Sequence, residues 1–168
     1  RSLKLEPRVR GAAEGLLDLA VSPDAAMRSR VALAIGRVGS PRLLSRLIEL
    51  TRDPEPVVRA AAAFALGRLE YYLAVDTEDA ERTRVRDALL PLLDEPVSLV
   101  AEQAAWALGI VDGGSTTAVA DWLHRASNST PETRPNPAVL AAMLNSWWRL
   151  AGADANAMRP FMGWPVAT

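Results

Sequence analysis

Arginines recur at fixed distances after two prolines, and this spacing is the feature of the sequence best suited to binding a charged group. Arg28 and Arg59 each follow their proline by five residues, and Arg37 and Arg68 follow by fourteen. Arg30 adds a further cation to the first set. Rows of cations of this kind can hold the phosphates of a nucleic acid or the carboxylates of a protein. The arginines are therefore candidate contacts for an acidic partner.

Few other side chains could support chemistry. The sequence has no cysteine, which excludes disulfides, thiol nucleophiles and zinc fingers. Its single histidine, His124, excludes multi-histidine metal sites, and its place near the end of a predicted helix favours a solvated or helix-dipole role. Acidic residues gather at 76–81, but without the spacing of a calcium loop, and they are predicted to begin a helix. We therefore predict no catalytic residue, no cofactor and no metal site.

The arginines belong to a repeated unit, because a proline-anchored helix recurs four times. The residue before each proline is a favoured helix N-cap in three of the four cases. Proline itself suits the first helical position, where no amide donor is needed. The sequence thus predicts four helices that begin at the proline of Ser22-Pro23, Asp53-Pro54, Glu95-Pro96 and Asn136-Pro137.

Within each unit the apolar residues follow the helical period. Counted from the proline as zero, positions 4, 8 and 12 form one apolar stripe in the first three units. Position 9 is always small, which would let a neighbouring helix approach closely. Position 10 is always large, and its side chains are predicted to fill the core between repeats: Leu33, Phe64, Trp106 and Trp147.

A leucine-rich segment precedes each of the first three prolines and predicts a partner helix, so that each unit is a helix pair. Such a short unit cannot bury its apolar face alone and must stack on its neighbours. The predicted fold is all-α, an α-α superhelix of about four helix pairs over residues 1–152, followed by an irregular tail at 153–168. The predicted units are 8–39, 40–70, 78–112 and 113–152, with loops at 70–81 and 127–136.

The stretch from Asp53 to Gly67 is similar to the consensus of HEAT repeats in their short bacterial form, as in phycobilin lyases. The resemblance extends over roughly residues 9–152 and implies a HEAT-like, right-handed curved solenoid whose second helices line the inner face. It also implies that Arg28 and Arg59 support turn aspartates such as Asp53. Residues 145–150 resemble the last repeat of HEAT arrays that precede the catalytic domain of some bacterial peptidyl-prolyl isomerases.

Three functions follow from this resemblance: a non-catalytic protein-interaction scaffold, the binding arm of a larger peptidyl-prolyl isomerase, and a nucleic-acid-binding array, for which HEAT-like DNA glycosylases are a precedent. Residues 1–69 hold 12 Lys/Arg against 7 Asp/Glu, whereas residues 70–168 hold 7 against 13. The two arginine rows also end after the second unit, at Ala101 and Ile110. The acidic balance and the short rows favour a protein or peptide partner over nucleic acid.

Trp148 is a further candidate contact, because the equivalent position holds alanine in the first three units. An indole there must point outward or fill the open end of the stack. No apolar run is long enough to cross a membrane. The start at Arg1 without methionine suggests a fragment of a longer protein. The oligomeric state and the compartment, cytoplasmic or periplasmic, stay open. The predicted interaction surface comprises Arg28, Arg30, Arg37, Arg59, Arg68 and Trp148.

Overall fold

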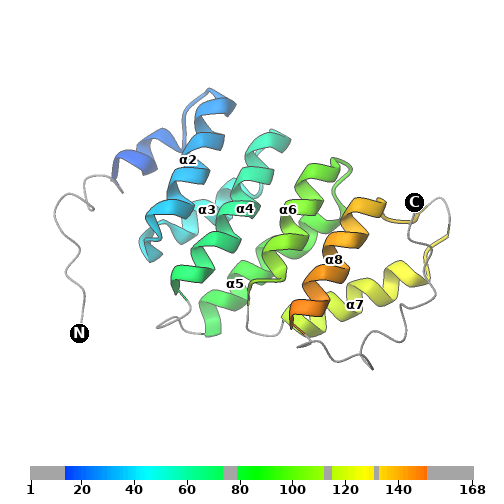
Figure 1. The fold of residues 1–168 in the computed structure, drawn as a ribbon. Coiled ribbons are helices and arrows are strands. Elements are labelled where there is room, and N and C mark those ends of the chain that lie inside the picture. The colour runs from blue at the N-terminus through cyan, green and yellow to red at the C-terminus, as the bar shows by residue number, and fades with distance from the viewer. Residues whose placement is uncertain (1–13, 74–78, 112–114, 131–132, 151–168) are drawn as a thin grey trace. The chain divides into compact units, whose positions relative to one another are not determined.

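The computed structural model of the chain describes residues 14–73, 79–111, 115–130 and 133–150. Regular structure in these ranges is entirely helical, and the helices pack in sequential pairs (Figure 1). The predicted all-α class of stacked helix pairs is therefore confirmed. The chain divides into two compact units, an N-terminal unit of residues 1–76 and a C-terminal unit of residues 77–168.

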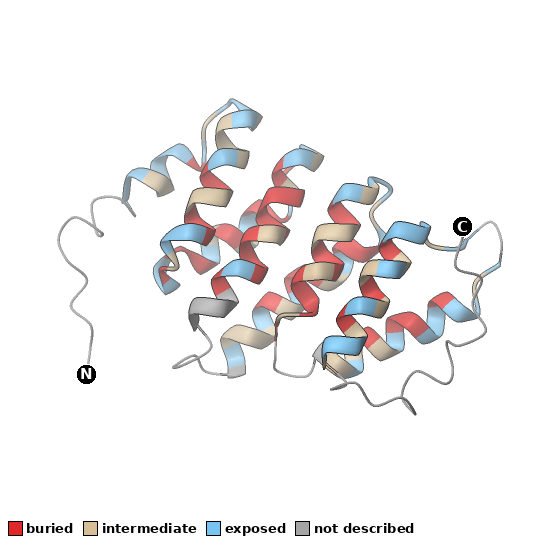
Figure 2. Cartoon of the chain, viewed as in Figure 1, coloured by how far each residue is buried: buried red, intermediate tan, exposed pale blue. Residues whose placement is uncertain are grey.

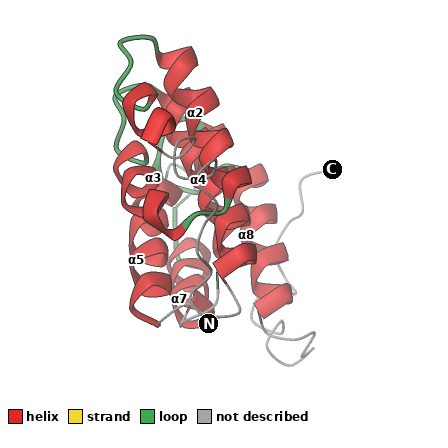
Figure 3. Ribbon diagram, turned by 90° about the vertical axis from the view of Figure 1, so that its left-hand side faces the viewer, coloured by secondary structure: helices red, strands yellow, loops and turns green. Residues whose placement is uncertain are grey.

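The N-terminal unit begins with a helical stretch at residues 14–19. It continues with α2 (Ala25–Val38), a short 3-10 helix (Pro41–Leu43), α3 (Leu44–Leu50) and α4 (Pro56–Leu73). Within this unit α2 and α4 run side by side in the same direction (Figure 1). Helix α3 packs mainly against α4, on one side of the layer that α2 and α4 form (Figure 3). The second helices α2 and α4 thus form one layer of the unit.

The C-terminal unit comprises α5 (Asp79–Leu89), a 3-10 helix (Leu90–Asp94), α6 (Ser98–Leu108), α7 (Ser115–Ser127) and α8 (Pro137–Leu150). Here α6 packs against α8, and α7 packs against α8. The predicted loop at 70–81 is too long, since α4 continues to Leu73 and α5 begins at Asp79. The predicted tail at 153–168 lies outside the described residues.

The predicted helix starts are wrong by two residues in the first three units. Helices α2, α4 and α6 begin at Ala25, Pro56 and Ser98, two residues after the anchoring prolines. The capping residue of α2 is Asp24, whose Oδ1 accepts a hydrogen bond of 2.9 Å from the amide of Ala26. In α4 the second proline, Pro56, takes the first helical position. It disfavours helical backbone in the residue before it, so the helix cannot begin earlier.

The offset of two residues between the anchoring proline and the helix start also changes the register of the fourth unit. Helix α8 begins at Pro137, so the proline two residues before it, Pro135, is the counterpart of the other three anchors. The pair Pro135 and Pro137 then matches Pro54 and Pro56 of the second unit. Because this shift of two residues turns the helix by about 200°, it decides which side chains of α8 face outward.

The core of each unit consists mainly of aliphatic side chains at the interfaces between helices, visible as the buried bands in Figure 2. The predicted stripe is buried at positions 8 and 12 in the first three units, whereas position 10 is only half-buried at Leu33, Phe64 and Trp106. The prediction that the large column fills the core is therefore wrong. Fully buried large side chains include Ile35, Leu47 and Leu66 in the N-terminal unit and Leu89, Leu108, Leu123 and Met143 in the C-terminal unit.

Glycine permits a close helix contact in each unit. A Cβ atom added at Gly36 of α2 would lie 2.9 Å from the Cα of Ala65 in α4. A Cβ atom added at Gly109, after α6, would lie 2.5 Å from the Oγ of Ser146 in α8. In the corrected register these two glycines both occupy position 13, and their partners both occupy position 11. Neighbouring second helices therefore meet in the same way in both units.

Candidate interaction surface on the second helices

One stripe of each second helix faces away from its packing partners. Positions 3, 7, 10 and 14 after the anchoring proline lie within a narrow arc, because each residue advances the helix by about 100°. In the N-terminal unit the stripe is exposed or half-buried except at Ala61, and we call its larger side chains the basic face. The basic face comprises Arg30, Leu33 and Arg37 on α2 and Val57, Phe64 and Arg68 on α4.

The contact between Gly36 and Ala65 places both stripes on the same side of the N-terminal unit. At about 100° per residue, the centre of the stripe lies roughly a quarter turn around the helix from the contact residue, which is position 13 in α2 and position 11 in α4. The two helices run in the same direction (Figure 1), so both stripes turn towards one side. The basic face is therefore continuous across α2 and α4.

Positive charge dominates this face. Arg30, Arg37 and Arg68 are all exposed, and none has an ion-pair partner among the described residues. Helix α2 contains no acidic residue. Val57 keeps 50% of its surface exposed, and the half-buried Leu33 and Phe64 occupy equivalent positions on the two helices. The face can thus offer both charge and apolar contact.

Arg28, in contrast, is directed into the turn between repeats. Its Nε donates to Oδ2 of Asp53 at 2.7 Å and its Nη2 donates to Oδ1 at 2.8 Å, with the two side chains only 13% and 6% exposed. Its Nη1 donates to the carbonyl oxygens of Ser22 and Pro23 at 2.9 and 3.1 Å. A bidentate pair of this kind fixes the geometry of both groups. Arg28 therefore ties the first turn of α2 to the turn before α4.

Hydrogen bonding from Arg28 lowers the pKa of Asp53, and the backbone amide of Glu55, which donates to Oδ1 at 3.0 Å, adds to this effect against the opposing effect of burial. The same pairing raises the pKa of Arg28. Asp53 is therefore held as a carboxylate at neutral pH. Its negative charge is already neutralised within the turn.

Arg59 repeats half of this arrangement. Its Nη1 donates to the carbonyl oxygens of Asp53 and Pro54 at 2.8 and 2.9 Å, as Arg28 does one repeat earlier. The structure thus separates the predicted surface residues into two groups. Arg28 and Arg59 bind the turns, while Arg30, Arg37 and Arg68 lie on the basic face.

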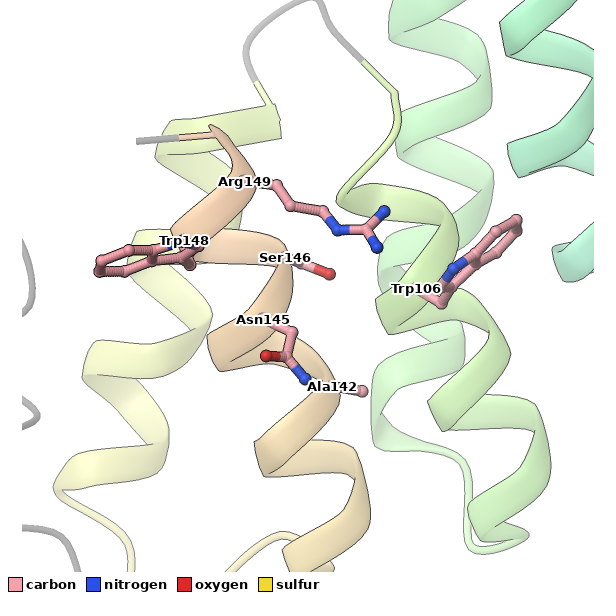
Figure 4. A pocket seen from close by; sticks show the side chains of 6 residues that line it. All are labelled: Trp106, Ala142, Asn145, Ser146, Trp148 and Arg149. Carbon is pink, nitrogen blue, oxygen red and sulfur yellow. The ribbon is translucent and has the colours of Figure 1, made fainter. Parts of the chain in front are cut away.

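The C-terminal unit carries a groove of about 360 Å³ between α6 and α8 (Figure 4). Its walls include Trp106 from α6 and Ala142, Asn145 and Arg149 from α8, where Arg149 extends towards α6. In the corrected register these are the stripe positions 10, 7, 10 and 14. The groove therefore lies on the C-terminal unit's counterpart of the basic face.

Ser146 joins the two helices beneath this groove. Its Oγ donates to the carbonyl oxygen of Ala105 at 2.6 Å, and the side chain is buried. Trp148 is 48% exposed, and its ring points away from α6 (Figure 4). In the corrected register it occupies position 13, which is glycine and not alanine in the first three units. Trp148 is also among the residues that line the groove.

Asn145 and Arg149 are not among the surface residues predicted from the sequence, because that prediction aligned α8 on Pro137. Alignment on Pro135 would have placed Arg149 at position 14, in line with Arg37 and Arg68. The repeated Pro-x-Pro pattern was the available signal. Val57 was also missed, since a single valine gives no sign of its exposure.

The described residues contain no group of three histidine, cysteine or acidic side chains placed to hold a metal ion. His124 is exposed in the last turn of α7, where its carbonyl oxygen accepts a 2.9 Å hydrogen bond from Nδ2 of Asn128. Residues 76 and 78 of the acidic cluster lie outside the described ranges. Among the helices that the structure describes, none is long and apolar enough to span a membrane.

Comparison with known proteins gives a family relation for part of the chain. No curated protein sequence matches it. The family relation covers the part of the chain that contains α2, α3 and α4, and with them the pairing of Arg28 with Asp53 and the whole basic face. Residues 13–80 match the family model for HEAT repeats.

Proposed function

We propose that the chain is a non-catalytic scaffold that binds a protein partner through the exposed stripes of its second helices. One observation carries this proposal: the basic face presents exposed arginines and partly exposed apolar side chains on one side of α2 and α4. Arginine and aromatic side chains such as phenylalanine are enriched at protein interfaces, and arginine is among the residues that contribute most to binding. HEAT repeats typically serve as protein-interaction scaffolds, which supports the same conclusion.

Rigidity of the underlying layer also supports binding. The turns at the start of α2 and α4 are fixed by Arg28, Arg59 and Asp53, and the two helices meet at a contact that excludes even a methyl group. A surface that is already ordered loses less conformational entropy when a partner binds. The basic face therefore has the preorganisation that a recognition surface needs.

A narrower version of this function follows from the resemblance of residues 145–150 to the last repeat of an isomerase arm. In that case the partner would be the substrate of a peptidyl-prolyl isomerase domain joined to this chain. The binding surface would still be the stripes of the second helices.

Site-specific cross-linking tests the scaffold proposal. A photoreactive phenylalanine derivative is placed at Leu33 on the basic face, and in a control variant at Glu49, which is exposed on α3. After irradiation in an extract of cells that express the gene, we expect a cross-linked protein from position 33 and none from position 49. Equal capture from both positions, or capture of nucleic acid alone, would contradict the proposal.

A further inference from the structure

We propose that the basic face recognises an acidic protein segment in which apolar residues are interspersed among the carboxylates. This inference rests on the proposed scaffold function and names the chemistry of the partner. It depends on three features of the N-terminal unit. The arginines of the basic face have no ion pair among the described residues, apolar side chains lie between them, and Arg28 and Arg59 bind the turns instead of the face.

The first feature is the separation of charge along α2 and α4. The acidic residues Asp24, Asp53 and Glu55 lie at the turns where the two helices begin. Glu70 follows Arg68 by two residues on α4, which places it about 200° around the helix from Arg68. Arg37 and Arg68 follow their prolines by fourteen residues, which corresponds to roughly 20 Å along a helix. At that distance exposed charges are largely screened at physiological ionic strength. The carboxylates of these turns therefore have little effect on Arg37 and Arg68.

Helix electrostatics explains only part of this pattern. Arg37 lies in the last turn of α2, where a cation stabilises the helix dipole. Arg30 lies in the middle of α2, and Arg68 lies more than one turn before the end of α4, so the dipole accounts for neither. Two of the three cations are thus explained neither by the helix dipole nor by an ion pair among the described residues.

The second feature is the apolar column between the cations. Leu33 lies one turn from both Arg30 and Arg37, and Phe64 lies one turn before Arg68. Half-buried side chains at these places let a ligand bury its own apolar groups between its ionic contacts. Because a carboxylate bound next to apolar surface is partly desolvated, its pairing with arginine is strengthened and becomes more specific.

The third feature disfavours nucleic acid. A phosphate backbone is best matched by an uninterrupted row of cations, and needs no apolar column. Arg28 and Arg59, which form the other predicted row of cations, donate to Asp53 and to turn carbonyl oxygens instead. The remaining cations alternate with leucine and phenylalanine. This alternation matches a polypeptide with acidic and apolar side chains.

Fluorescence anisotropy with a labelled peptide of Glu-Glu-Leu repeats tests the inference. We expect the chain to bind this peptide, and expect Gln-Gln-Leu and Glu-Glu-Ser peptides to bind more weakly. Arg30→Glu and Arg68→Glu should each weaken binding by about 3- to 10-fold. The matched controls Arg42→Glu and Arg52→Glu change exposed arginines outside the basic face and should alter binding less than twofold. Circular dichroism checks that each variant is folded.

Three outcomes would overturn the inference. Equal weakening by face and control variants would indicate attraction by net charge alone. Tighter binding of a short DNA duplex than of the peptide, lost in the face variants, would make the surface a nucleic-acid site. If the peptide does not bind but position 33 still gives a specific cross-link, the acidic partner is refuted and the scaffold function is retained. If neither peptide binding nor cross-linking is observed, the scaffold function is refuted as well.

Discussion

The two units join their neighbouring second helices with the same geometry but with different chemistry. In the N-terminal unit the arginine at position 5, Arg28, reaches the next repeat and pairs with Asp53. In the C-terminal unit this position is Ala101, which is buried, and the link between helices is made by Ser146 and the carbonyl oxygen of Ala105. A second polar link there joins Nδ2 of Asn136 to Oγ of Ser98 at 2.9 Å.

This difference shows which parts of the repeat are constrained by packing and which are not. Both units keep a glycine at position 13 against a small residue at position 11, because the backbones approach too closely for any larger side chain. The polar connection between repeats can instead be ionic or neutral. The exposed stripe is equally variable, since it is basic in the N-terminal unit and combines Trp106 with Asn145 and Arg149 in the C-terminal unit.

The largest expected effect comes from matched truncations in the two cores. Leu47→Ala and Leu123→Ala each remove a fully buried side chain and should lower the free energy of unfolding by about 2–5 kcal/mol. Phe64→Ala and Trp106→Ala should cost less, because these rings are only half-buried. Urea unfolding gives the total loss, and hydrogen exchange locates it in one unit or the other. A larger loss from Phe64→Ala than from Leu47→Ala would contradict the burial described here.

The ionic link should make the N-terminal unit sensitive to acid. Asp53→Ala removes an acceptor of charged hydrogen bonds and should destabilise by about 1–3 kcal/mol at neutral pH, whereas Asp94→Ala, at an exposed site, should cost little. Because the pKa of Asp53 is lowered on folding, the unfolded chain binds more protons, so this contribution is lost as pH falls below about 4.

Urea titrations at pH 7 and at acidic pH measure this dependence. Asp53→Asn should reduce the loss of stability on acidification relative to the unaltered chain. An unchanged pH dependence in Asp53→Asn would show that the ionic link contributes little to folding.

The shared glycine contact should be the point at which the two units respond alike. Gly36→Ala and Gly109→Ala each place a methyl group within 3 Å of a neighbouring helix, which should cost a net 1–2 kcal/mol, roughly, after any gain in helix propensity. Gly15→Ala is the matched control, because no atom lies within 4 Å of its added Cβ, and it should be neutral or slightly stabilising. Thermal unfolding of the three variants would settle the comparison; a stabilised Gly36→Ala would mean that α2 and α4 lie further apart.

The smallest effect concerns two buried serines. Ser146→Ala removes the hydrogen bond to Ala105 and should cost about 0.5–1.5 kcal/mol. Ser40→Ala removes a buried hydroxyl that has no hydrogen-bond partner in the structure, and should be neutral or stabilising. If urea unfolding gave equal losses for both, Ser146 would not be the specific link between α6 and α8.

The helical period and the repeated prolines were sufficient to predict the fold class, because apolar residues recur in the sequence at the period of a helix with one buried face. They did not predict the exact register. The first turn depends on backbone restrictions imposed by proline on its neighbours, as at Pro56, and the predicted starts were two residues too early in the first three units. In α8 the predicted start at Pro137 is correct, but alignment on Pro137 instead of Pro135 hid Asn145 and Arg149.

The side-chain roles were harder to predict. Arg28 and Arg30 are only two residues apart, yet one binds Asp53 and the other is exposed. Spacing along the chain cannot distinguish them, whereas the direction of each side chain around the helix can. The large residues at position 10 were assigned to the core for the same reason: size alone does not show which face of a helix is open.

The contact between Gly36 and Ala65 also sets the interval at which a ligand would meet the repeats. Such close packing places two helix axes about 8 Å apart, whereas an extended polypeptide advances about 3.3 Å per residue. A segment lying across α2 and α4 would therefore reach equivalent side chains, such as Leu33 and Phe64, every two to three of its own residues. A methyl group at Gly36 would increase the distance between the two helices and therefore lengthen that interval. The glycine would thus set the spacing of contact residues in a partner that lies across both helices.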